Sequence, residues 1–183
     1  MEQRQQKVGA FQSQAIHLEK RMALQNPAKN SQIMLRGISS LISPELLSTL
    51  CRMGHHDEIV FGDAHFPGES HTDHCIRADG LRIDDLLDAV LPLFELDHVI
   101  DTPVMMMGPM AEDLANPTIA ADYQKVYDGY SEIVKKHYPE SPDIGKVDKY
   151  DFYPRTKKAF AVVMTGDVRI YANLILSKGV TPC

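Results

Sequence analysis

The chain lacks the features of a secreted or membrane protein. Its 183 residues include only three cysteines, Cys51, Cys75 and Cys183, which stand far apart. An odd count without close spacing gives no disulfide framework, and it is typical of a reducing compartment. No apolar run approaches the roughly 20 residues that a transmembrane helix needs, and no apolar stretch typical of a secretory signal follows the first residues. We therefore expect a cytoplasmic protein with no membrane partner.

Several signatures of ligand binding are also missing. The net charge is −6 and no dense basic run occurs, which argues against a nucleic-acid partner. The sequence has no phosphate-cradling glycine loop, no dinucleotide fingerprint and no G-x-S-x-G nucleophile elbow. His71, His74 and Cys75 are ligand-type side chains at short spacing, but zinc sites usually add a second matching pair, and none follows. We expect no nucleic-acid partner and no metal site.

What the sequence does contain is enough apolar material for one core. Hydrophobic residues make up 44% of the chain, and its length suits a single domain. Residues 1–33 differ, since they are rich in Gln, Lys and Arg and poor in large apolar side chains. We expect residues 1–33 to be an extension, flexible or partly helical over 15–24, and residues 34–183 to form the domain.

Helices and strands alternate along this domain. Ser43, followed by a proline and a glutamate, is a helix N-cap, and Gly54 stands where a C-terminal glycine belongs. Capping and periodicity predict helices over 44–53, 84–91 and 117–137, with Gly129 weakening the last, and strands over 58–62, 104–107, 160–165 and 173–176. The expected fold is a single α/β domain with a central sheet flanked by helices.

Polar residues that could carry chemistry concentrate between positions 55 and 74. His55 comes just before the first predicted strand and Asp63 just after it. Histidine has an unperturbed pKa of about 6.5, so it exchanges protons near neutrality, and ligand sites of α/β folds lie beyond the carboxyl ends of strands. On spacing alone, however, His55 could be a solvated loop histidine and Asp63 a turn residue. These residues by themselves name no substrate.

An ordered set of motifs takes the interpretation further. It runs L-I-S-P-E-L-L (41–47), M-G-H (53–55), D-E-I-V (57–60), D-A-H-F-P (63–67), I-R-A-D-G-L (76–81), P-L-F-E-L-D (92–97), F-Y (152–153), K-A-F-A-V-V (158–163), T-G (165–166), Y-A-N (171–173) and K-G-V (178–180). Over residues 34–182 the chain resembles the D-ribose pyranase / L-fucose mutarotase family. The R-A-D-G and F-P segments favour its L-fucose branch.

The resemblance implies roles for particular residues. His55 matches the catalytic histidine of the family, and Asp63 matches the carboxylate that holds the sugar. Lys149 stands where the L-fucose branch leads us to expect an arginine, which would grip two oxygens at once. The substrate-binding residues implied in this way are Asp63, Asp97, Lys149, Tyr153, Tyr171, Ala172 and Asn173.

The activity that the resemblance implies is interconversion of the α and β anomers of L-fucose by acid/base ring opening and closure, with no metal or organic cofactor. The family also implies a homo-oligomer, a decamer, whose pockets are completed by neighbouring subunits. Three alternatives stay open: the same chemistry on D-ribose, a non-catalytic sugar-binding or transport-accessory protein, and a metal-dependent hydrolase built on the histidine-rich loop.

Overall fold

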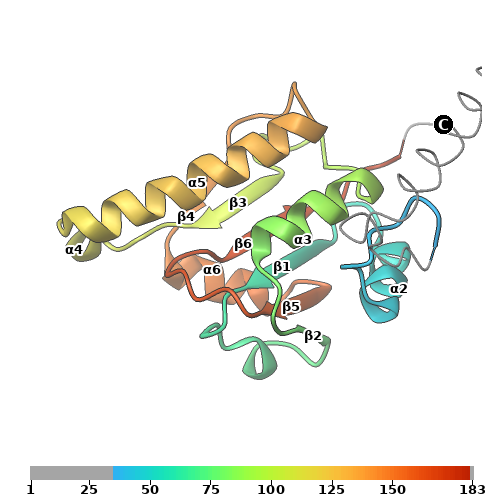
Figure 1. The fold of residues 1–183 in the computed structure, drawn as a ribbon, viewed down its shortest axis with the longest axis horizontal. Helices are drawn as coiled ribbons and strands as arrows, with labels where there is room; N and C mark the ends of the chain where they lie inside the picture. Colours follow the sequence, from blue (N-terminus) through green and yellow to red (C-terminus); the bar gives the residue numbers. More distant parts are fainter. Residues whose placement is uncertain (1–34, 182–183) are drawn as a thin grey trace, which may run out of the picture. The chain divides into compact units, whose positions relative to one another are not determined.

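The structure, a computed structural model, describes residues 35–181, so the predicted extension over 1–33 lies outside the described residues. A six-stranded mixed sheet forms its centre, with the order β2-β5-β1-β6-β3-β4 (Figure 1). The strands are β1 (Glu58–Gly62), β2 (Cys75–Ala78), β3 (Val104–Met107), β4 (Gly145–Val147), β5 (Ala161–Thr165) and β6 (Leu174–Ser177). The four predicted strands are confirmed, and β2 and β4 are additions.

Strand direction decides which loops meet. β5 is parallel to both β1 and β2, and β3 is parallel to β4. β6 alone is reversed, being antiparallel to both β1 and β3. The carboxyl ends of the other five strands and the amino end of β6 therefore share one edge of the sheet, which we call the carboxyl edge. We call the opposite edge the amino edge.

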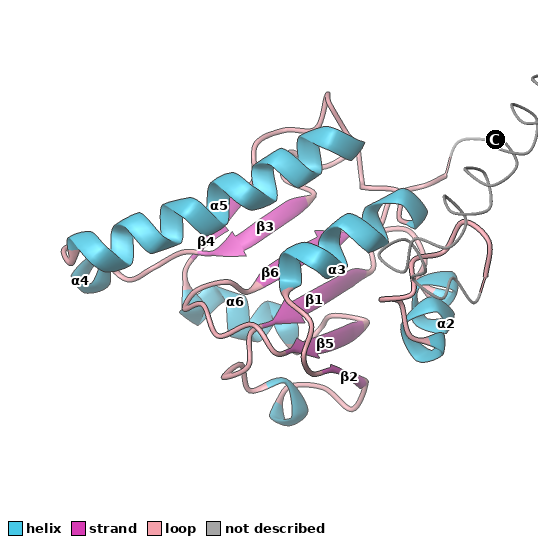
Figure 2. Cartoon of the chain, in the orientation of Figure 1, coloured by secondary structure: helices cyan, strands magenta, loops and turns pink. Residues whose placement is uncertain are grey.

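Helices cover both faces of the sheet, which confirms the predicted fold class. The helices of the described residues are α2 (Pro44–Arg52), α3 (Ile83–Val90), α4 (Ala111–Leu114), α5 (Pro117–His137) and α6 (Lys149–Thr156), with 3-10 turns at Gly68–Ser70 and Leu91–Leu93. Figure 2 shows α3 and α5 on one face of the sheet and α6 on the other. No helix in residues 35–181 is both long and apolar enough to span a membrane.

Alternation along the strands builds the core beneath α6. Successive strand side chains point to opposite faces, so Val60, Val162 and Ile175, which are register partners, share a face. They form one buried cluster with Phe152 of α6, and all four side chains have no exposed surface. Burial of a large apolar side chain contributes about 1.5–3 kcal/mol. This packing fixes α6, which carries Lys149 at its first position.

The capping predictions have mixed outcomes. The Ser43 hydroxyl accepts from the backbone N–H of Leu46, and the Asn116 side chain begins α5 in the same way, as predicted. Gly54 directly follows Met53, the C-cap of α2, as predicted, but its backbone is not left-handed, so it does not close the helix as such a glycine usually does. Gly129 does not interrupt α5, which runs unbroken from Pro117 to His137.

Candidate active site

A pocket of about 350 Å³ opens at the carboxyl edge of the sheet. Its walls come from the ends of β1 and β3, from α4, from the start of α6 and from the segment that leads into β6. The lining residues are Asp63, His65, Phe66, Met107, Asp113, Lys149, Tyr153, Ile170, Tyr171 and Asn173. Five of the residues singled out in the sequence thus lie in one cavity: Asp63, Lys149, Tyr153, Tyr171 and Asn173.

Asp63 and Asn173 form a reciprocal pair at the bottom of this pocket. The backbone N–H of Asp63 donates to Asn173 Oδ1 over 2.8 Å, and Asn173 Nδ2 donates to Asp63 Oδ2 over 2.9 Å. The other carboxylate oxygen accepts from the backbone N–H of His65 over 2.9 Å. Both side chains are buried, so the pair holds the carboxylate in one orientation.

Burial changes the acidity of Asp63. Burial raises the pKa of this carboxyl above its ordinary value, and the hydrogen bonds from His65 and Asn173 only partly offset that effect. Desolvation disfavours the charged form of a carboxyl, and perturbed acids in pockets are candidates for proton transfer. Asp63 is therefore suited both to hold a sugar hydroxyl and to exchange a proton with it.

Lys149 and Tyr153 enter the pocket from α6. They stand four residues apart, which places them on the same face of a helix. The Tyr153 ring lies 5.8 Å from the Phe66 ring and 5.2 Å from the His71 ring, so it is wedged between aromatic neighbours. The Lys149 ammonium lies 5.2 Å from the centroid of the Tyr150 ring. One cationic and one phenolic residue thus line the same cavity as Asp63.

The segment before β6 contributes unequally. Tyr171 has a left-handed backbone, with φ 60°, and its hydroxyl donates to Asp113 of α4. Burial, and next the nearby Asp113 carboxylate, raise the pKa of this phenol. Ala172 is fully buried and does not line the pocket; its carbonyl accepts from the Tyr130 hydroxyl over 3.0 Å. Ala172 thereby ties the segment to α5.

Sequence reasoning did not single out half of the pocket. Phe66 and Met107 are buried and form its apolar floor, while Ile170 is 47% exposed at its rim. His65 lines the same pocket and is the histidine that stands beside Asp63. The D-A-H-F-P segment already carried His65 and Phe66, so that signal was available. Asp113 lies outside every quoted motif.

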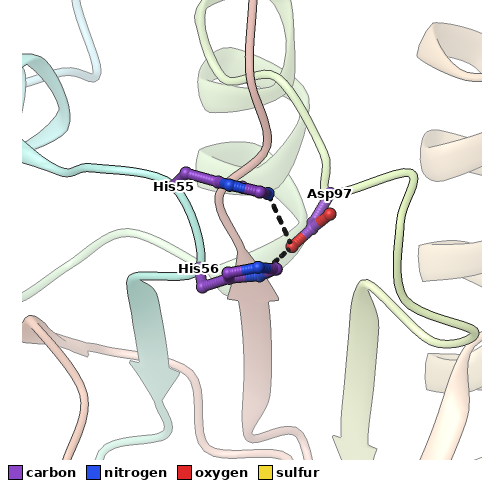
Figure 3. A group of neighbouring side chains, drawn as sticks. All are labelled: His55, His56 and Asp97. Atoms are coloured by element: carbon purple, nitrogen blue, oxygen red, sulfur yellow. Dashed lines mark hydrogen bonds and ion pairs between the residues drawn. The ribbon is translucent and has the colours of Figure 1, made fainter.

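His55 lies elsewhere in the chain, at the amino edge. It precedes β1 whereas Asp63 follows it, and five strand residues at about 3.3 Å each separate the two by about 16 Å. Figure 3 shows His55 and His56 side by side in the turn before β1, both directed toward Asp97. The two rings are stacked, with centroids 3.7 Å apart and an interplanar angle of 23°.

Asp97 belongs to this amino-edge cluster and not to the pocket. It is fully buried, and its Oδ1 accepts from the backbone N–H of Val99 over 3.0 Å. Its Oδ2 lies 2.6 Å from His56 Nδ1 and 3.6 Å from His55 Nε2 (Figure 3). Burial alone would raise its pKa, but the Val99 and His56 hydrogen bonds outweigh burial and hold the pKa below its usual range. Asp97 therefore acts as an anion beside two histidines.

His55, His56 and Asp97 are also potential metal ligands. Within residues 35–181 their ligand atoms form a group in which all lie within 4.8 Å of one another. A metal ion lies in the plane of each imidazole that binds it. Because the His55 and His56 rings are stacked nearly parallel, one ion cannot lie in both planes unless a ring rotates. The geometry instead suits hydrogen bonding to a shared carboxylate. His71, His74 and Cys75 do not form such a group.

A larger groove of about 660 Å³ lies between α3, α5 and the loop after β5. Its charged side chains already bind one another: Arg82 pairs with Asp84, Lys125 with Asp122, and Arg169 with both Asp84 and the buried Asp167. These contacts make the groove a structural network. The smaller pocket, with its converging polar groups, is the better candidate for a ligand.

Fold and pocket together define an α/β protein with a pocket suited to a small polar ligand at the carboxyl edge of its sheet. The chain belongs to the RbsD / FucU transport protein family, which matches residues 36–181. This match confirms the family expected from the ordered motifs.

Individual relatives agree with this assignment. The chain is 44% identical over 149 residues to an L-fucose mutarotase of Haemophilus influenzae, a match that covers 81% of this chain and 99% of the relative. It is similar to the crystal structure of a fucose mutarotase from Streptococcus pneumoniae in complex with L-fucose, at 40% identity and a TM-score of 0.73, covering 81% and 100% of the two chains. FucU from Bifidobacterium longum gives 37% identity and a TM-score of 0.72, covering 80% and 100%.

Proposed function

We propose that this chain is an isomerase that interconverts the α and β anomers of L-fucose. The observation that carries the proposal is the pocket at the carboxyl edge, where Asp63, Asn173, Lys149 and two tyrosines converge in a chain 44% identical to an L-fucose mutarotase. Carboxylate, amide, ammonium and phenol groups are the donors and acceptors that fix the hydroxyls of a monosaccharide.

The reaction needs proton transfer and nothing redox. The anomeric O–H gives its proton to a base, the bond between C1 and the ring oxygen breaks, C1 becomes an aldehyde carbon, and the ring oxygen takes up a proton from an acid. Rotation about C1–C2 and the reverse steps then give the other anomer. An imidazole serves in both directions, because it can accept a proton in one step and donate it in the other, and we assign this role to His55.

His55 reaches the sugar, in this proposal, from a neighbouring copy of the chain. Within one chain, β1 separates it from the pocket, yet its side chain is 37% exposed at the amino edge. Exposed apolar side chains surround both places: Val99 and Val180 at the amino edge, Leu114 and Ile170 near the pocket. Contact between copies at these two places would bury those side chains. We therefore propose a cytoplasmic homo-oligomer, a decamer, in which each pocket receives the histidine of its neighbour.

We further propose that residues 1–33 take no part in the chemistry. Their composition lacks core-forming side chains, and the family match begins only at residue 36. A chain shortened to begin at Met34 is expected to exchange fucose anomers at the full rate. A shortened chain that folds but exchanges slowly would contradict this.

Saturation-transfer NMR on L-fucose at anomeric equilibrium tests the function, because it measures exchange that leaves concentrations unchanged. The protein is expected to speed exchange without metal, nucleotide or reductant. His55→Ala is expected to lower the rate by about 10²–10⁴-fold. His65→Ala, at the histidine already in the pocket, is the matched control and is expected to lower the exchange rate far less.

Exchange no faster than in buffer would refute the proposal, and a larger loss of rate in His65→Ala would move the catalytic role to His65. Parallel titrations with D-ribose separate the ribose alternative, and binding without exchange would identify a sugar-binding protein.

A further inference from the structure

Asp97 forms its histidine hydrogen bond with His56 and not with His55, the proposed catalytic residue. Asp97 Oδ2 lies 2.6 Å from His56 Nδ1 but 3.6 Å from His55 Nε2, and only the first is a hydrogen-bonding distance. Asp97 is fully buried and its other oxygen is held by the Val99 N–H. One oxygen of one carboxylate is thus available to two stacked histidines, and His56 takes it.

We infer that His56 is a positioning residue: it competes with His55 for the Asp97 carboxylate and so leaves the His55 ring free to exchange its proton with the sugar. This inference rests on the proposed function. If His55 held the buried anion, its protonated form would be stabilised, and less of the ring would be unprotonated and able to accept a proton near neutrality. With His56 on the carboxylate, His55 stays beside the negative charge without binding it.

The backbone holds His56 in place for this contact. Its φ is 68°, a left-handed conformation that costs a non-glycine residue stability and is often found where function requires it. Its N–H donates to the Lys178 carbonyl over 2.9 Å, and the Gly54 N–H donates to Asp57 Oδ2 over 2.7 Å. The turn is therefore fixed on both sides, which directs the His56 ring at Asp97.

Stacking places both rings beside the same carboxylate. The two ring centroids are 3.7 Å apart, so His55 and His56 compete for one Asp97 oxygen, and the shorter distance belongs to His56. The other charged groups of these segments have other neighbours. Asp57 accepts from the Gly54 N–H, and the Lys178 ammonium donates to the Gly179 carbonyl. The Glu95 charge helps raise the pKa of Tyr138, and His98 is exposed. The balance between His55 and His56 therefore depends on Asp97.

The left-handed backbone allows two closely matched variants. Glycine adopts φ 68° without strain, so His56→Gly removes the competing ring and leaves the turn intact. Asparagine also tolerates this conformation, and its Nδ2 is as many bonds from the backbone as His56 Nδ1. His56→Asn therefore keeps a donor on Asp97 without a titrating group.

Carbethoxylation by diethyl pyrocarbonate, read out by peptide mass spectrometry over a pH series, reports how much His55 is unprotonated and does not depend on activity. In His56→Gly the pH midpoint of His55 modification is expected to lie about one unit above that in His56→Asn. The pH profile of L-fucose exchange is expected to move upward by the same amount. In the double variant His56→Gly/Asp97→Asn, the upward shift of the His55 modification midpoint is expected to disappear.

Equal midpoints for His56→Gly and His56→Asn would overturn the inference, as would an upward displacement that persists when Asp97 is neutral. A wild-type protein that fails to exchange fucose would refute the proposed function instead, and the modification midpoints would still test the competition for Asp97.

Discussion

Two inactive variants, His55→Ala and Asp63→Ala, are expected to regain activity when they assemble together. His55 and Asp63 lie at opposite ends of β1, about 16 Å apart along the strand, so one chain cannot bring both to one sugar. In a mixed assembly, a pocket of the His55→Ala chain still has Asp63 and can receive the intact His55 of an Asp63→Ala neighbour. Each such contact restores a complete site.

The expected yield follows from random mixing at equal amounts. Half of the pockets keep Asp63, and half of those adjoin a chain that keeps His55, so about one quarter of the sites are intact. Each variant alone has none, and its rate is lower by about 10²–10⁴-fold. Mixing should therefore raise exchange from about 1% or less to about a quarter of the wild-type rate.

The assay is saturation-transfer NMR on mixed assemblies, obtained by producing the two chains together with different affinity tags and purifying on both. The matched control mixes wild type with the doubly substituted chain His55→Ala/Asp63→Ala. Sites shared between chains give about one quarter activity in both mixtures, whereas sites within one chain give none in the first and about half in the second. Background exchange in the first mixture together with half activity in the second would refute the shared site.

Three further substitutions test other parts of the site and fold. Lys149→Ala is expected to weaken fucose binding by about 1–3 kcal/mol through loss of a charge-assisted hydrogen bond, whereas Lys149→Arg should match or exceed wild type; unchanged binding in Lys149→Ala, in a sugar titration, would make it a surface lysine. Asp113→Asn, which weakens the acceptor of the Tyr171 hydroxyl, should raise KM with less effect on kcat, and a kcat loss alone would contradict a positioning role. Although burial tends to raise it, the pKa of Asp167 is lowered by its bonds to Arg169 and to backbone N–H groups. The folded-state pKa therefore lies below the unfolded one, and the stabilisation, complete above about pH 4, is lost as pH falls through the folded-state pKa. Asp167→Asn should lower the unfolding free energy by about 2–3 kcal/mol at pH 7, in urea titrations, and the difference from wild type should shrink in acid; a difference independent of pH would refute the ionic account.

The predicted strands can be recognised from their own residues, whereas the missed strands are defined by pairing with a neighbour. β5 is buried at every position and β1 at all but its first, so each shows as an apolar run. β2 and β4 lie at the two ends of the sheet order, are four and three residues long, and contain few buried side chains. Each is defined by pairing with one neighbour, β5 or β3, and its own residues show no alternation that identifies a strand. Only the tertiary structure reveals them.

The site was partly predictable for a similar reason. Short motifs identified Asp63 and Asn173, which the fold brings together across 110 positions of sequence. Asp113 carries no such signal, because it stands on a four-residue helix and meets Tyr171 only through the fold. The resemblance also grouped Asp97 with the pocket residues, whereas the structure places it beside His55 and His56. A motif reports that a residue belongs to a site, but not which edge of the sheet it occupies.

The single reversed strand explains how two separate groups of polar residues arise from one sheet. Because β6 runs against β1, the residue before β6, Asn173, lies at the carboxyl edge beside Asp63, which follows β1. In an all-parallel sheet a residue before a strand would lie at the opposite edge. The same reversal brings Lys178, after β6, to the amino edge, where its carbonyl accepts from the His56 N–H. β6 thus completes the pocket at one end and fixes the histidine turn at the other. Ring opening needs a positioned sugar and proton-transfer groups at one place, and in the proposed enzyme the contact between the carboxyl edge of one copy and the amino edge of the next brings His55 to the pocket that holds Asp63.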